Sequence, residues 1–321
     1  MSVRHKVIID ADPGIGDAVA ITLALMDPQI EVVALTSCAG LVSGDQAFRN
    51  LQTIISMVDP PLWPRLGWSN GKSFRVEDSP VFSGILSGHG ESGLGDCRPI
   101  AAPLHQPTDS VKLMVELVRA HPGELTLLTL GPLTNVLGAF ERSSEFLSEL
   151  KQLRILGGSV SAGGDVTACA ELNMLADPVA AKAILTSPAN KTLLPLDTSH
   201  QFELSFDQYS QLGVDGFSRL GRLLNELIPF ALRISRTQLG REGILLPEVM
   251  AVASISHSEL FEQRPMVCDV ELTGELTRGM TVFDRRPVPH WKQNIEVLTE
   301  VDTVGVLDYM LRLIASSGVG E

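Results

Sequence analysis

The chain is poor in aromatic residues for a protein of its size. Phe, Tyr and Trp make up 5% of the 321 residues, whereas hydrophobic residues together make up 44%. Leu, Val, Ile and Ala must therefore fill the core, which suits helices packed on a parallel sheet whose strands are buried on both faces. No linker, repeat or low-complexity tract interrupts the chain, so we expect a single domain covering residues 1–321.

Three further absences exclude classes of location and partner. No window of about 18 apolar residues is present, and the apolar run before Asp10 is too short for a secretory signal, so we expect no membrane partner. The net charge is −13 and no block of Lys and Arg exists, which argues against nucleic acid and leaves a small-molecule substrate. The four cysteines are far apart without a C-x-x-C pair, which predicts buried, reduced thiols and a cytoplasmic protein; they are Cys38, Cys97, Cys169 and Cys268.

Strand-like and helix-like runs alternate along most of the chain. Runs such as IEVVALTSC (30–38) and LTLLTLG (125–131) are strand-like, and runs such as TNVLGAFER (134–142) are helical in period. We expect a long surface loop over 58–78 and a β pair within 268–283. This order predicts an α/β fold of Rossmann-like type, with a mostly parallel central sheet flanked by helices on both faces.

Acidic residues are concentrated where the first predicted strand ends, in VIIDADPGIGDAVA (7–20). Ligand sites of open α/β sheets form at such strand ends. Asp10 and Asp12 are two residues apart and should share a face, while Asp17 falls at the start of the next helix. Gly14 and Gly16 would let the backbone turn tightly between them.

Carboxylates crowded in this way repel one another unless they are protonated or bound to a cation. Oxygen ligands without His or Cys favour Ca²⁺ or Mg²⁺, although the same acids could simply cap a helix and be solvated. An EF-hand loop is excluded because its twelfth position, which must be Glu, is Ile21. A metal-dependent phosphatase using Asp10 and Asp12 remains an alternative, weakened by the Pro-Gly pair that follows.

The same segment, IIDADPGIGDAVAI, resembles the D-x-D-P-G-x-D-D-A-x-A signature of the nucleoside hydrolase family, of the inosine-uridine preferring type. The resemblance extends in order over nearly the whole chain. The other matching motifs are HGESGLG (89–95), LGPLTN (130–135), ILGGS (155–159), AELNMLADPVAA (170–181), PLDTSH (195–200), RGMTVFD (278–284) and QNIEV (293–297).

This resemblance implies an enzyme that cleaves the N-glycosidic bond of a nucleoside with water held on one Ca²⁺. By position, Asp12 would ligate the metal and take the proton from the water. Asp17, Glu248 and the backbone carbonyl of Leu130 would complete the ligands, with Asp10 supporting them. The resemblance also implies a homodimer or homotetramer.

Four further residues are implied in substrate binding. Glu171 and Asn173 would bind sugar hydroxyls, and Asp165 takes the place of a family Asn at the 5′ end of the sugar. His89 would lie near the base or the sugar; its alternative is a loop histidine bonded only to backbone.

The chain departs from the family pattern at positions that bear on the substrate. Gly16 replaces an acid that grips a sugar hydroxyl, and Leu41 replaces an Asn. Pro247 replaces a His that often protonates the leaving group, and Glu248 replaces an Asp ligand. Losing two such contacts would weaken transition-state binding of ribose by roughly 3–5 kcal/mol. We therefore expect either an unusual N-glycoside substrate or a weak or inactive homologue that binds a sugar-like ligand.

The stretch before Glu248 carries Arg233, Arg236 and Arg241. These arginines either lie on the solvent-exposed face of a helix, or one of them contacts an acidic or carbonyl-bearing leaving group.

Overall fold

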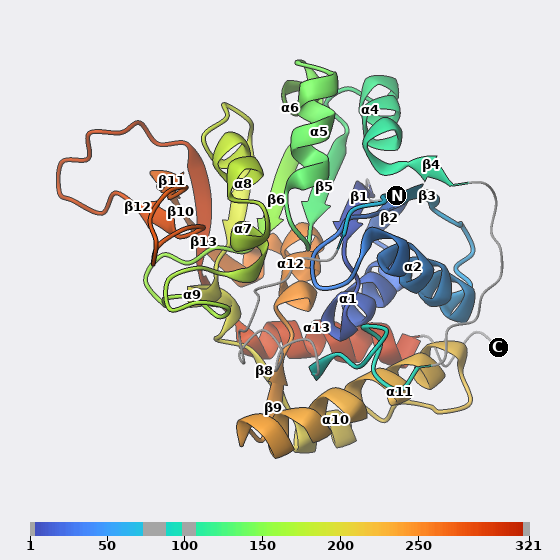
Figure 1. Ribbon diagram of the computed structural model, residues 1–321. Coiled ribbons are helices and arrows are strands. Elements are labelled where there is room, and N and C mark those ends of the chain that lie inside the picture. The colour runs from blue at the N-terminus through green and yellow to red at the C-terminus, as the bar shows by residue number, and fades with distance from the viewer. Residues whose placement is uncertain (1–3, 73–87, 98–106, 317–321) are drawn as a thin grey trace.

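The computed structural model describes residues 4–72, 88–97 and 107–316, and a nine-stranded sheet forms its centre (Figure 1). The strands lie in the order β10-β13-β7-β6-β5-β1-β2-β3-β4. Neighbouring strands run parallel, except for β10 and β13, which are antiparallel. The bounds in this sheet are β1 His5–Ala11, β2 Ile30–Ser37, β3 Arg65–Trp68, β4 Thr108–Asp109, β5 Leu125–Thr129, β6 Gln152–Leu156, β7 Lys191–Leu194, β10 Phe261–Met266 and β13 Ile295–Val301.

Two small antiparallel pairs and a set of helices complete the described part of the chain. The pairs are β8 (Glu203–Ser205) with β9 (Gly243–Leu245), and β11 (Cys268–Val270) with β12 (Thr281–Phe283). The helices are α1 Ile15–Met26, α2 Gly44–Val58, α4 Ser110–Ala120, α5 Thr134–Arg142, α6 Phe146–Glu149, α7 Leu172–Ala176, α8 Pro178–Leu185, α9 Leu196–Ser199, α10 Phe206–Gln211, α11 Arg219–Ile234, η1 Ser235–Leu239, α12 Pro247–Ser256, η2 Ser258–Leu260 and α13 Thr303–Ser316.

Helices cover both faces of the sheet, as the alternation of the sequence predicts. Val7 and Ile9 of β1 belong to a core shared with α1, α2, α11, α12 and α13. Ile8, between them, belongs to a second core shared with α4, α5, α6 and α8. Side chains alternate in a strand, so β1 contributes to both cores and must be apolar throughout. The two helical layers lie above and below the sheet in Figure 1.

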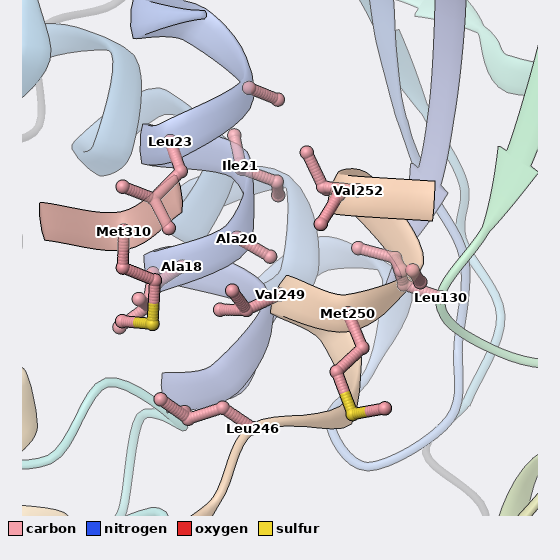
Figure 2. Close-up of a cluster of buried hydrophobic side chains, with 14 of the residues drawn as sticks. Ala18, Ala20, Ile21, Leu23, Leu130, Leu246, Val249, Met250, Val252 and Met310 are labelled. Carbon is pink, nitrogen blue, oxygen red and sulfur yellow. The ribbon is translucent and has the colours of Figure 1, made fainter. Parts of the chain in front are cut away.

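The packing of α1 against α12 positions the site. Figure 2 shows Ala20 and Ile21 of α1 facing Val249 and Val252 of α12, while Ala18 lies on the other side of α1. All five side chains are fully buried. Small and β-branched side chains let the two helix axes approach closely, which brings the first turns of α1 and α12 together.

The structure corrects the sequence-based expectations in three places. The predicted loop over 58–78 contains strand β3, which pairs with β2, and residues 73–78 lie outside the described residues. The edge strand β10 and its neighbour β13 were not predicted. Cys169 is partly exposed, whereas the other three cysteines are buried, and all four are free. Within residues 4–72, 88–97 and 107–316, no helix is long and apolar enough to cross a bilayer.

Candidate active site

A cavity of about 820 Å³ opens at the carboxyl ends of the central strands. Residues that directly follow or end four strands line it: Asp12 after β1, Leu130 after β5, Leu156 of β6 and Leu194 of β7. The first turns of α1 and α12 and the end of α11 form the opposite wall. The sequence therefore predicted the right edge of the sheet for a ligand site.

Asp12 is fixed on the wall of this cavity. One of its carboxylate oxygens, Oδ2, accepts a hydrogen bond from the backbone N–H of Leu41. A Cβ at Gly40 or Gly131 would overlap the Asp12 carboxylate, so glycine is needed on both sides of it. Burial, and then the charge of Asp17, hold the pKa of Asp12 well above its usual range.

Asp17 and Glu248 face the same space from the first turns of α1 and α12. Oδ2 of Asp17 accepts a 2.9 Å hydrogen bond from the N–H of Gly14, but its Oδ1 is buried without a partner. Oε2 of Glu248 is likewise buried without a partner. Burial raises the pKa of Asp17 to about 7, and burial together with the Asp17 charge raises that of Glu248 to about 8.

These two unpartnered oxygens are the feature that fits a cation. Among the described residues, no group of three or more His, Cys, Asp and Glu side chains is already arranged as a metal site. The carboxylates of Asp12, Asp17 and Glu248 would thus have to turn toward an ion. The carbonyl of Leu130, buried in the cavity wall, accepts one 2.8 Å hydrogen bond from Asn173 Nδ2 and keeps a second lone pair. The donor set is all oxygen, which suits Ca²⁺.

Gly14 and Gly16 are required for space rather than for a turn. Gly14 has φ −90°, and Gly16 lies within α1, so neither adopts a left-handed conformation that only glycine tolerates easily. A Cβ on Gly14 would lie 2.6 Å from Nδ1 of His89, and a Cβ on Gly16 would overlap the carboxylate of Glu248. Side chains from distant segments occupy the places of the missing Cβ atoms.

Asp10 is fully buried but does not line the cavity. Its Oδ1 accepts hydrogen bonds from Thr36 Oγ1 (2.6 Å) and from Asn135 Nδ2 (2.9 Å). Asn135 also donates to the carbonyl of Ser37, so the network ties the ends of β1 and β2 to the start of α5. Sequence reasoning missed Thr36 and Asn135, although both follow the rule that polar residues gather at strand ends.

Glu171 and Asn173 both line the cavity, and both are engaged with backbone. The Glu171 carboxylate caps α7 by accepting from the N–H of Asn173 (2.9 Å) and of Met174 (3.1 Å), and it also accepts from Gly158 (2.8 Å). The amide nitrogen of Asn173 is used, which leaves Oδ1 for a ligand. Burial, then the Asp165 charge, raises the pKa of Glu171 to about 8, and burial raises that of Asp165 to about 6.

His89 is bonded to backbone and also lines the cavity. Its Nδ1 accepts a 3.1 Å hydrogen bond from the N–H of Ile15, and its ring lines the cavity. Burial lowers its pKa to about 4, so the ring is neutral at pH 7 with its proton on Nε2. It can donate a hydrogen bond there. Leu41 and Pro247 also line the cavity and offer no polar side chain.

Comparison with known proteins gives a consistent group of relatives. The sequence profile described as inosine-uridine preferring nucleoside hydrolase matches residues 7–308. Uridine nucleosidase 1 of Arabidopsis thaliana is 31% identical over 317 residues, which cover 96% of this chain and 92% of that protein. The pyrimidine-specific ribonucleoside hydrolase RihA of Citrobacter koseri is 29% identical, covering 96% of this chain and 97% of that one.

Solved structures agree. A plant nucleoside hydrolase, the PpNRh1 enzyme, superposes with a TM-score of 0.85 at 27% identity, covering 97% of this chain and 98% of that one. A purine-preferring ribonucleoside hydrolase from Gardnerella vaginalis superposes with a TM-score of 0.84 at 26% identity and the same coverage. The names of these relatives differ in the base they prefer.

Proposed function

The chain belongs to the inosine-uridine preferring nucleoside hydrolase family, enzymes that hydrolyse N-glycosidic bonds of nucleosides, and from that premise we propose a Ca²⁺-dependent reaction in the cavity described above. The observation that carries the proposal is the pair of buried, unpartnered oxygens on Asp17 and Glu248 beside Asp12. Burying carboxylates without partners is costly, and a hard cation would offset that cost.

In this proposal, Asp12, Asp17, Glu248 and the Leu130 carbonyl would hold Ca²⁺, which would supply positive charge to orient and acidify the attacking water. Asp12 takes the proton. The N–H of Leu41 fixes the orientation of its carboxylate. Asp10 does not touch the substrate; it holds the strand ends on which Asp12 sits.

The bond changes follow from this arrangement. The water oxygen bonds to C1′ of the sugar, and the C1′–N bond breaks with its electron pair going to the leaving nitrogen. Positive charge develops on the sugar in the transition state, and the acids of the cavity stabilise it. In this proposal, Asn173 Oδ1 and the Glu171 carboxylate accept from sugar hydroxyls, Asp165 binds the 5′ end, and His89 Nε2–H donates to the substrate. All four residues line the cavity, which supports these roles.

The sugar pocket is atypical in this proposal. Gly16 has no side chain to bind a hydroxyl, and Leu41 presents an apolar surface. A deoxygenated or substituted sugar therefore fits better than plain ribose. We also propose a homodimer or homotetramer, a single domain over 1–321, and a cytoplasmic location in keeping with the free cysteines.

The test is a hydrolysis screen of ribo-, deoxyribo- and modified nucleosides, with Ca²⁺ and with a chelator. We expect Ca²⁺-dependent cleavage and a Ca²⁺-dependent rise in melting temperature. The double variant Asp12→Ala, Asp17→Ala should lose both effects. A folded protein whose melting temperature does not change with Ca²⁺ would overturn the metal site. If none of the nucleosides is cleaved, the result would favour a homologue that binds a sugar-like ligand without hydrolysing it.

A further inference from the structure

The segment 233–241, from the end of α11 to just after η1, carries three arginines with different surroundings. Arg233 pairs with Asp96, with Nη2 2.9 Å from Oδ2. Arg236 pairs with Glu242, with Nε 3.8 Å from Oε1. Arg241 lines the cavity and, among the described residues, has neither an ion-pair partner nor a side-chain hydrogen bond. The segment therefore leaves one guanidinium available to a ligand, and it is the one at the cavity.

His200 stands near Arg241 on the cavity wall. Burial lowers the pKa of His200, and the nearby charge of Arg241 lowers it further. Glu242, the acid next to Arg241 in sequence, pairs with Arg236 instead. Asp197, whose charge acts on His200, does not compensate Arg241 either. Its carboxylate accepts hydrogen bonds from the N–H groups of Val160 and Ser161, and it does not line the cavity. Arg241 therefore gives this part of the cavity wall one positive charge, and no ion pair within the described residues neutralises it.

Within the described residues, no ion pair joins Arg241 to the carboxylates that line the same cavity. The cavity wall also carries apolar side chains that suit a flat ring; they include Leu196, Ala231, Ile234, Ile244 and Leu246.

The cavity is therefore lined by carboxylates, which bind the metal and the sugar in the proposed function, and also by one guanidinium without an ion-pair partner among the described residues. We propose that Arg241, with His200 beside it, binds a negatively charged leaving group, so that the preferred substrates are N-glycosides whose base carries a carboxylate. This inference rests on the proposed hydrolase function and names its substrate class.

The chemistry of the leaving group supports this assignment. When the C1′–N bond breaks, the electron pair goes to the base, which departs as an anion unless it is protonated. Pro247, at the start of α12, has no proton to give, and His89 is neutral with its Nδ1 engaged. A guanidinium stabilises the departing negative charge without proton transfer, and solvent then protonates the free base.

The experiment compares three substrates that differ only in a carboxylate: uridine, orotidine and 5-carboxyuridine. We expect kcat/KM to be higher for at least one carboxylated base. In Arg241→Gln the ratio of carboxylated substrate to uridine should fall about tenfold or more, because hydrogen bonds to charged groups contribute that much. Arg241→Lys should give an intermediate ratio, since it keeps the charge but not the planar fork.

Arg236→Gln is the matched control, because Arg236 lies on the same segment, is paired with Glu242 and does not line the cavity. It should leave the substrate ratio unchanged. Uridine 5′-monophosphate tests the other source of an anion, a phosphate on the sugar. If Arg241 raises kcat/KM for this nucleotide and not for a carboxylated base, then Arg241 binds an anion on the sugar side and the proposal is wrong.

Calorimetry with free orotate and uracil separates this inference from the proposed function. Orotate should bind more tightly than uracil, and Arg241→Gln should remove the difference. Orotate binding that depends on Arg241, without cleavage of any nucleoside, would support the anion site and contradict the hydrolase. Cleavage of uridine with no preference for carboxylated bases, and no selective effect of Arg241→Gln, would overturn the anion site alone.

Discussion

The carboxylate of Glu248 occupies the space where a side chain on residue 16 would begin: a Cβ built on Gly16 would overlap Oε2 of Glu248. The two residues lie in the first turns of α1 and α12, which pack together through small and β-branched side chains. Glu248 on α12 therefore keeps its position only because residue 16 on α1 has no side chain.

We predict that Gly16→Ala displaces the Glu248 carboxylate and lowers both turnover and the Ca²⁺-induced rise in melting temperature. A displacement of about 1 Å can reduce turnover by up to about 100-fold. Alanine is intrinsically better than glycine in a helix by about 1 kcal/mol, so a loss of activity without a matching loss of stability would identify the clash as the cause. Turnover and thermal melts with and without Ca²⁺ check this.

The double variant Gly16→Ala, Glu248→Asp should recover part of the activity, because an acid one methylene shorter clears the new methyl group. Gly138→Ala is the control: it lies in α5 away from the cavity, and its Cβ would meet only a side-chain methyl of Val111 at 3.0 Å. If Gly16→Ala behaves like Gly138→Ala, the two positions are not coupled.

We predict that Asp12→Asn lowers turnover by about 10²–10⁴-fold, the usual contribution of a general base. The amide oxygen of Asn can still accept from the N–H of Leu41, so the fold and the melting temperature in a chelator should change little. Steady-state kinetics and circular dichroism check this. Activity within a few-fold of the unchanged protein would mean that another group takes the proton.

The sequence predicted the parallel sheet and the edge where the site forms, because strand alternation and strand-end acids are local patterns. It did not predict β3 or β13, which are defined by their partners more than by their own residues. Arg65–Trp68 is a short strand with one buried residue, and only pairing with β2 makes it part of the sheet.

The candidate site was predicted in composition but not in contacts. Period-2 reasoning placed Asp10 beside Asp12, yet Thr36 and Asn135 hold Asp10 away from the cavity. From the sequence, Gly16 was interpreted as a turn residue or as a position where the family's acid is missing, because nothing in the segment 7–20 indicates that Glu248 lies against it. Contacts between residues so distant in sequence depend on how α1 and α12 pack.

The surroundings of Asp165 and Glu171 predict how the stability of the fold depends on pH. Both acids have pKa values raised above their ordinary values, to about 6 and about 8. The folded state therefore binds their protons more tightly than the unfolded state does. Their contribution to stability is full below about pH 4, and it is lost as pH rises through 6 to 8. In a chelator, the melting temperature should fall across this range.

Asp165→Asn should make this fall shallower, because it removes one titrating group and the charge that helps to raise the pKa of Glu171. The amide oxygen can still accept from the N–H of Leu172, so the variant keeps that contact. The expected difference in melting temperature at pH 8 is on the order of a few degrees. Parallel pH profiles for the two proteins would contradict the coupling.

The position of Leu41 predicts which sugars the cavity accepts. Its backbone N–H holds Asp12, and its side chain lines the cavity, where Cδ2 would lie 3.0 Å from a Cβ on Gly14. A ribose hydroxyl facing this side chain would lose its hydrogen bonds to water without gaining a partner. That costs roughly 1–3 kcal/mol, so uridine and inosine should be poor substrates, with kcat/KM below about 10⁴ M⁻¹s⁻¹.

Leu41→Asn should raise kcat/KM for uridine relative to its 2′- and 3′-deoxy analogues by about five- to tenfold, because it offers an amide to the hydroxyl and keeps the backbone N–H on Asp12. Leu41→Ala is the control, since it makes room without a polar group and should not restore the preference. Adding an acid at position 16 alone should not help, because Glu248 already fills that space. Efficient cleavage of uridine by the unchanged protein would show that Leu41 does not face a hydroxyl.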